Sequence, residues 1–247
     1  MKTEQFKQQI EEQLERYENE IEYPFNPTTN ANRTFVRDGI IRIEDYLNAP
    51  IKILWVLKEA NSEYDDIADM REALANLQDE NNPDRITPKW GKTFNPIAYS
   101  TYGIFEKMDW LTLPDIDGNA SEVLKHMPKI AYINVKKYAG VNQTHDPEVH
   151  QFYGKYKGLL FEQICLINPD VIIFGGTHKY FSEEDMSNQL GTISNVERVA
   201  DEPHYFHKYQ CGNKLLLNTY HPNARADKQL YCDSIINAVN SWREKNN

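Results

Sequence analysis

Residues 51–62 have the sequence IKILWVLKEANS, an apolar run that ends abruptly in polar residues. The run is too short for a typical helix and is rich in β-branched and aromatic residues, so it predicts a strand over 51–57. Runs of the same character occur at 130–135, 171–174 and 215–219. Because all four are nearly continuous in apolar residues, we expect a parallel sheet that is covered on both faces.

The segments between these runs have helical patterns, for example at 66–77 and 153–166, which could cross over either face of the sheet. The sequence therefore predicts an α/β fold, a three-layer α/β/α sandwich around a parallel sheet. Residues 3–22 carry apolar residues at spacings of three and four, which predicts an amphipathic helix that ends before Pro24. The stretch 24–33 is rich in Pro, Asn and Thr and predicts a loop. We expect this helix (1–24) to pack on or extend a single domain (25–247).

Composition limits the classes of function. The 247 residues are 40% hydrophobic and 26% charged, which is typical of a globular protein. No apolar run approaches the roughly 20 residues that span a bilayer, and the opening lacks a secretory pattern, so we expect a cytoplasmic protein without a membrane partner. The three cysteines have no CxxC spacing, which argues against disulfides and thiolate metal clusters. A net charge of −10 disfavours general attraction to nucleic acid, so any such contact must be local.

Each predicted strand ends in polar residues that could carry chemistry. The first is followed by KEANS, the second closes on NVKK, the third on GGTH and the fourth on YHPNAR. In open parallel sheets, ligands bind beyond the carboxyl ends of the strands. The sequence therefore predicts a functional pocket at this edge of the sheet.

Four segments together resemble the uracil-DNA glycosylase superfamily: ILWVLKEAN (53–61), YINVKK (132–137), NPDVIIFGG (168–176) and LLLNTYHPNAR (215–225). The resemblance extends over about residues 50–240, and the last segment is its most specific part. It implies four parallel strands in the order 2-1-3-4 between helical layers. It also implies hydrolysis of the N-glycosidic bond of uracil or a related base, after the nucleotide has turned out of the stack.

The resemblance implies roles for particular residues. His221 would stabilise the negative charge on the leaving base, and Asn134 would read the base edge because an amide both donates and accepts hydrogen bonds. Glu59 or Asn61 would hold the attacking water.

An aromatic side chain would stack on the base, and Phe94 is the first candidate, with Tyr99 and Tyr102 as alternatives in a stretch that has the character of a loop. A basic rim on the pocket, suited to a phosphate backbone, would consist of Lys136, Lys137, Lys155, Lys157, Lys179 and Arg225.

The chain also departs from the family pattern. The loop KEAN lacks the usual Gly and Pro, the cysteines of an iron–sulfur cluster have no counterparts, and no bulky apolar wedge follows Pro222. We therefore expect no cofactor, and DNA that is single-stranded or locally opened, or a free nucleotide, as the partner. The alternative is a module on the same fold that binds a nucleotide or modified base without cleaving it.

Structural roles compete with these assignments. His221 could be fixed within a turn, Asn134 could satisfy backbone groups at a strand end, and Lys58 and Glu59 could form a solvated pair. Two groups of possible metal ligands, His145, Asp146, Glu148 and His150 in the first and His204 with His207 in the second, lack a recognised ligand spacing. We therefore predict no catalytic metal.

Overall fold

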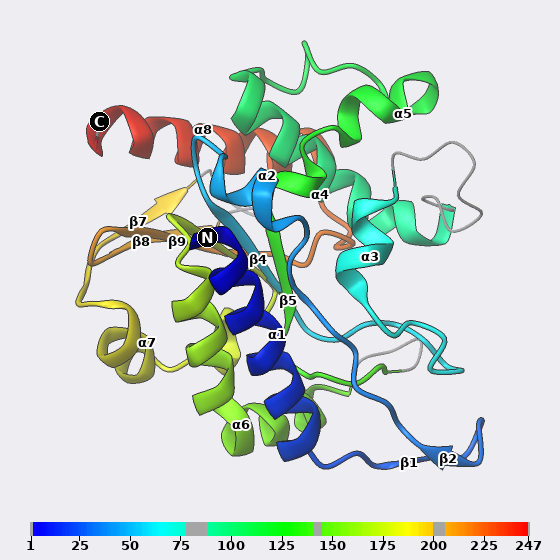
Figure 1. Cartoon of the computed structure of the whole chain (residues 1–247). Helices are drawn as coiled ribbons and strands as arrows, with labels where there is room; N and C mark the ends of the chain where they lie inside the picture. The colour runs from blue at the N-terminus through cyan, green and yellow to red at the C-terminus, as the bar shows by residue number, and fades with distance from the viewer. Residues whose placement is uncertain (1, 78–87, 141–144, 200–205, 247) are drawn as a thin grey trace.

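The computed structural model describes residues 2–77, 88–140, 145–199 and 206–246. Within these ranges, seven strands form one sheet in the order β3-β5-β4-β6-β9-β8-β7 (Figure 1). The four predicted strands are its parallel centre: β4 (Ile53–Leu57), β5 (Ala131–Asn134), β6 (Val171–Gly175) and β9 (Lys214–Thr219). The predicted α/β class and order of these four strands are confirmed.

The sheet is larger than the four strands that the sequence predicted. Antiparallel strands extend it at both edges: β3 (Gly39–Ile40) beside β5, and β8 (Phe206–Cys211) with β7 (Ile193–Val199) beside β9. These strands lack the signal of the central ones, because β3 has two residues and β7 is exposed along most of its length.

Helices cover both faces of the sheet, and alternate side chains of each central strand enter different cores. Trp55 and Leu57 of β4 face the first core, whereas Leu54 and Val56 face the second. The first core includes residues of α3 (Met70–Ala75), α4 (Pro88–Glu106), α5 (Ile116–Leu124) and α8 (Lys228–Asn246). The second includes residues of α1 (Lys2–Glu20), α2 (Ile43–Leu47), α6 (Asp146–Ile167) and α7 (Glu183–Leu190).

The N-terminal helix is part of the domain's core. Leu14 and Tyr17 of α1 are buried, and the Tyr17 hydroxyl donates to the carbonyl of Leu159 in α6. The predicted loop after α1 forms a hairpin of β1 (Phe25–Asn26) and β2 (Ala31–Asn32). Two single helical turns, η1 (Met127–Lys129) and η2 (His178–Tyr180), precede β5 and follow β6. No helix in the described ranges is both long enough and apolar enough to cross a membrane.

The prediction of a loop around Phe94, Tyr99 and Tyr102 is wrong. All three lie in α4, which continues through Pro96. Gly91 and Pro96 disfavour a helix, but the burial of residues such as Ile97 and Ala98 in the first core stabilises it here.

Candidate active site

His221 lies in a loop that packs closely on the end of β6. A Cβ atom on Gly176 would lie 3.1 Å from the His221 backbone nitrogen, and Gly176 has a φ of +72°. A Cβ atom on Gly175 would lie 2.3 Å from Leu57 Cδ2 and 3.1 Å from Pro222 Cδ. The two glycines therefore allow the ends of β4, β6 and β9 to approach one another closely. These are three of the four strand ends that the sequence predicted to lie together.

The protonation state of His221 is fixed by its surroundings. Its Nδ1 accepts a hydrogen bond from the backbone N–H of Asn223 at 3.1 Å. Burial, with smaller contributions from the nearby charges of Lys58 and Lys228, lowers the pKa of His221 to about 4. At neutral pH the imidazole is therefore uncharged and carries its proton on Nε2, where no described residue accepts it.

Two residues of α8 hold the His221 loop in place. Lys228 Nζ donates to the carbonyls of Pro222 and Ala224, both at 2.7 Å. The Tyr231 hydroxyl donates to the carbonyl of Tyr220 at 3.1 Å. Neither residue was predicted from the sequence, although Lys228 lies only seven positions after His221.

Asn134 ends β5 with a buried amide whose orientation is set by a neighbour. The Tyr132 hydroxyl donates to Asn134 Oδ1 at 3.2 Å, so Nδ2 is the group left over, and it is buried without a hydrogen-bond partner. The backbone N–H of Asn134 donates to Asp38 Oδ2 at 2.7 Å. Its side chain therefore serves no described backbone group, in contrast to the structural role considered above.

The three aromatic candidates occupy different environments. Phe94 is buried and packs on the Tyr132 ring at a centroid distance of 5.8 Å, which places it in the neighbourhood of Asn134. Tyr99 instead packs on Trp110 at 5.0 Å and lines a separate cavity. Tyr102 is buried and donates to Glu122 at 2.5 Å. Of the three candidates, Phe94 is thus the one that packs on a hydrogen-bonding neighbour of Asn134.

The residues of the first loop do not pair with each other. Lys58 pairs with Asp146 at 2.8 Å, while the Glu59 carboxylate, 3% exposed, pairs with Lys136. A Cβ atom on Gly140 would overlap the Glu59 carboxylate, so this glycine makes room for it. Asn61 is exposed and forms a backbone bridge to Gly140.

Two residues of the predicted basic rim are unavailable to a phosphate. Lys136 is buried between Glu59 and Glu148, and Lys137 is buried against Asp38 at 2.7 Å. Burial lowers the pKa of Lys137. Because each ammonium is enclosed and paired, the prediction that these two lysines contact a nucleic-acid backbone is wrong.

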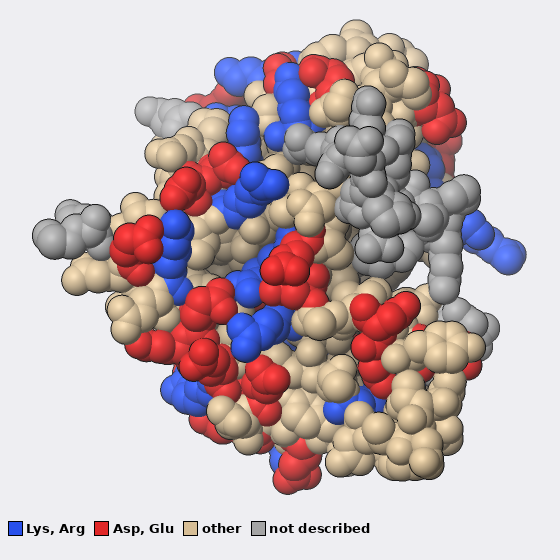
Figure 2. Space-filling model, turned by 45° about the vertical axis from the view of Figure 1, so that its right-hand side comes forward, with Lys and Arg blue, Asp and Glu red and all other residues tan. Residues whose placement is uncertain are grey.

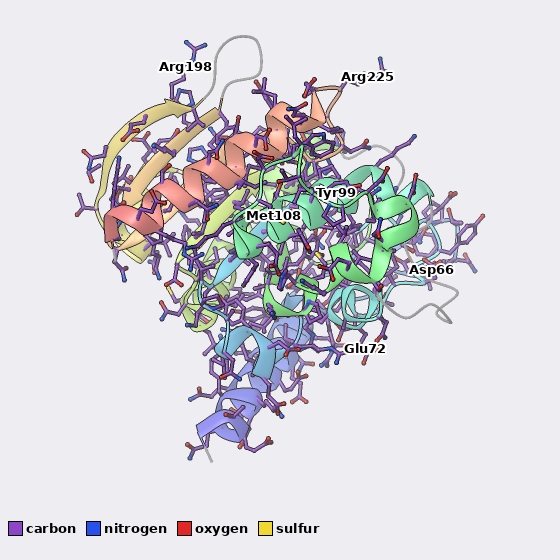
Figure 3. All side chains as sticks on the ribbon, turned by 90° about the horizontal axis from the view of Figure 1, so that it is seen from above. Asp66, Glu72, Tyr99, Met108, Arg198 and Arg225 are labelled. Carbon is purple, nitrogen blue, oxygen red and sulfur yellow. The ribbon has the colours of Figure 1, made fainter. Side chains whose placement is uncertain are left out.

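The remaining members of the basic rim are all exposed. Lys155, Lys157 and Lys179 are each paired with a carboxylate, of Glu22, Asp185 and Asp146 respectively. Arg225 is exposed at the outer edge of the molecule near the start of α8 (Figure 3). On the face shown in Figure 2, basic and acidic side chains are interspersed and do not form one continuous basic patch.

Asp146, part of the first group of possible metal ligands, lies at the centre of a network of hydrogen bonds. It accepts from Lys58 and Tyr180 at 2.8 and 2.7 Å and from Lys179, and these bonds hold the pKa of Asp146 well below its usual range. Within the described ranges, no three His, Cys, Asp or Glu side chains are grouped so as to hold a metal ion. His204 lies outside the described residues.

No model of a known protein family matches this chain, and no curated protein matches it in sequence.

Proposed function

We propose that this protein hydrolyses the N-glycosidic bond of uracil or a closely related base, and that His221 stabilises the departing base. The observation that carries the proposal is the uncharged His221 imidazole, whose Nδ1 is occupied by the Asn223 N–H. Its Nε2–H is a donor fixed in position before the reaction. Such a donor stabilises an oxyanion that develops on the base as the bond breaks.

Asn134 supports recognition of the base. Its Nδ2 is a buried donor without an acceptor, and a group of this kind costs about 1–3 kcal/mol. A base carbonyl oxygen would satisfy it, while the second lone pair of Oδ1 could accept an N–H from the same base edge. Phe94, which packs on Tyr132 beside this amide, would supply the aromatic surface.

Of the two candidates for holding the water, Asn61 has the more suitable surroundings. The Glu59 carboxylate is enclosed and paired with Lys136, so it is not free to hold a water. Asn61 has an exposed amide in the same loop. We assign the water to Asn61 and a supporting role to Glu59.

The charge distribution favours a substrate that needs few phosphate contacts. Lys136 and Lys137 are buried, whereas Arg225 is exposed. Arg225 is therefore the predicted phosphate contact on the loop that carries His221. Single-stranded or locally opened DNA, or a free nucleotide, fits this arrangement better than an intact duplex does.

Base release from oligonucleotides with one uracil, single-stranded and duplex, tests the proposal. Removal of one preplaced donor lowers such rates by roughly 10²–10³-fold, so His221→Ala should do so. Asn223→Ala is the matched control, because it keeps the backbone N–H that binds His221 Nδ1. Release by the natural protein that His221→Ala leaves unchanged would contradict the assigned role.

A second candidate function is binding of a nucleotide or modified base without cleavage. The Glu59–Lys136 pair favours it, because it takes the one carboxylate of the first loop away from an attacking water. In that case uracil or uridine monophosphate should raise the melting temperature, and no substrate should yield an abasic product.

A further inference from the structure

A cavity of about 610 Å³ lies between α4, α5 and the first residue of α8, apart from the residues at the strand ends. Its size falls within the range of small-molecule sites. The cavity does not take in His221, Asn134 or Phe94, so the proposed function leaves it unexplained.

Two aromatic rings form one wall of the cavity. Tyr99 and Trp110 pack edge to face with their centroids 5.0 Å apart. The Tyr99 hydroxyl accepts the backbone N–H of Ile116 at 2.8 Å, which fixes the ring against α5. Figure 3 shows Tyr99 on α4. A held aromatic wall of this kind suits a flat ring, with stacking worth about 1–3 kcal/mol per base.

The charged side chains that line the cavity are mostly positive. Lys92 and Lys228 line it together with one carboxylate, Asp117. Lys228 donates two of its three protons to the His221 loop and retains one. Asn95 also lines the cavity, and its Oδ1 is buried without a hydrogen-bond partner. Two ammonium groups and one unpaired amide oxygen therefore line the same cavity as the two aromatic rings.

We propose that this cavity binds a mononucleotide unit, an aromatic base that carries a phosphate. The base would stack on Tyr99 and Trp110 and donate an N–H to Asn95, and the phosphate would lie between Lys92 and Lys228. The unit could be a free nucleotide or part of a nucleic-acid strand. The proposal does not depend on glycosylase activity, because it uses none of the residues assigned to the base or to the water. Lys228 is the residue that the two sites share, since it also holds the His221 loop.

Titration calorimetry on the full chain tests the proposal, with adenosine monophosphate, uridine monophosphate, adenosine, inorganic phosphate and a six-residue oligothymidylate as probes. We expect a monophosphate to bind more tightly than adenosine or phosphate alone. Lys92→Ala should weaken binding about tenfold, and Trp110→Leu should weaken it as well. Lys245→Ala, the same change on an exposed lysine of α8, should leave it unchanged.

The arms of this experiment separate the possible outcomes. Tighter binding of the oligothymidylate would identify a strand as the source of the unit, whereas equal or tighter binding of a monophosphate would identify a free nucleotide. Absence of saturable binding at millimolar concentration would overturn the proposal. Binding that His221→Ala abolishes and Lys92→Ala does not affect would also overturn it, because the ligand would then occupy the strand ends.

Discussion

Two partly buried histidines should make the folded state lose stability between pH 7 and pH 5. Burial lowers the pKa of both His178 and His221 to about 4, with smaller contributions from neighbouring positive charges. Because an unfolded chain binds a proton near pH 6.5 and the native imidazole does not, acid favours unfolding over this interval. The contribution of the two histidines to the unfolding free energy is present above pH 6.5 and is lost as the pH falls toward 4.

The size of the effect follows from the two pKa values. For a group that titrates near 6.5 when unfolded and near 4 when folded, the loss of unfolding free energy from pH 7 to pH 5 is about 2 kcal/mol. Two such histidines give about 4 kcal/mol. This is a large part of the 5–15 kcal/mol that is typical of a folded domain.

Urea unfolding at the two pH values measures this loss. His178→Phe removes one titrating group and keeps an aromatic ring stacked on Tyr209, where the centroids are now 5.0 Å apart. The variant should lose about 2 kcal/mol less than the natural protein between pH 7 and pH 5. His145→Ala alters an exposed histidine and is the control. An equal loss in His178→Phe and the natural protein would refute the reasoning.

Three further predictions concern the candidate site. Lys136→Met should lower the unfolding free energy by about 3 kcal/mol in urea, because it leaves the Glu59 carboxylate buried and unpaired, and Glu59→Gln in the same chain should recover much of that loss. A loss of unfolding free energy as small as that from breaking a solvent-exposed ion pair would contradict this prediction. Lys228→Met should reduce base release on the order of 10²-fold by displacing the His221 loop, with KM little changed and partial recovery in Lys228→Arg; an unchanged kcat would count against this positioning role. Gly140→Ala should cost about 1–3 kcal/mol, because its Cβ would overlap the Glu59 carboxylate, and a melting temperature equal to that of the natural protein would argue against this packing.

The centre of the fold could be predicted because burial on both faces leaves a continuous apolar signal. The edges could not, since β7 is mostly exposed and, among the residues that the structure describes, pairs with β8 alone. The sequence failed to predict the helix α4 for a different reason. Pro96 interrupts its local pattern, and only contacts with the first core compensate for this.

The same distinction applies to the candidate site: features set by neighbouring residues could be predicted, and contacts between residues far apart in the sequence could not. The sequence placed His221 and Asn134 at strand ends, because a strand end is a local feature. It could not show that Lys137 is enclosed, since its partner Asp38 is 99 positions away. A lysine next to a predicted pocket has the same local pattern whether it faces solvent or a buried carboxylate, and only the tertiary structure separates the two.

Lys228 connects the two sites proposed for this protein. It holds the loop of His221 through two carbonyls, and it lines the cavity that contains Tyr99 and Trp110. Its charge is also one of the causes that lower the pKa of His221. An anion bound at its remaining proton would offset that charge and pull on the loop, so occupancy of the cavity would change both the position and the proton affinity of the imidazole. By linkage, a base held by His221 would alter the affinity of the cavity for its ligand to the same degree. Lys228 would therefore couple the nucleotide proposed for the cavity to the reaction proposed at the strand ends.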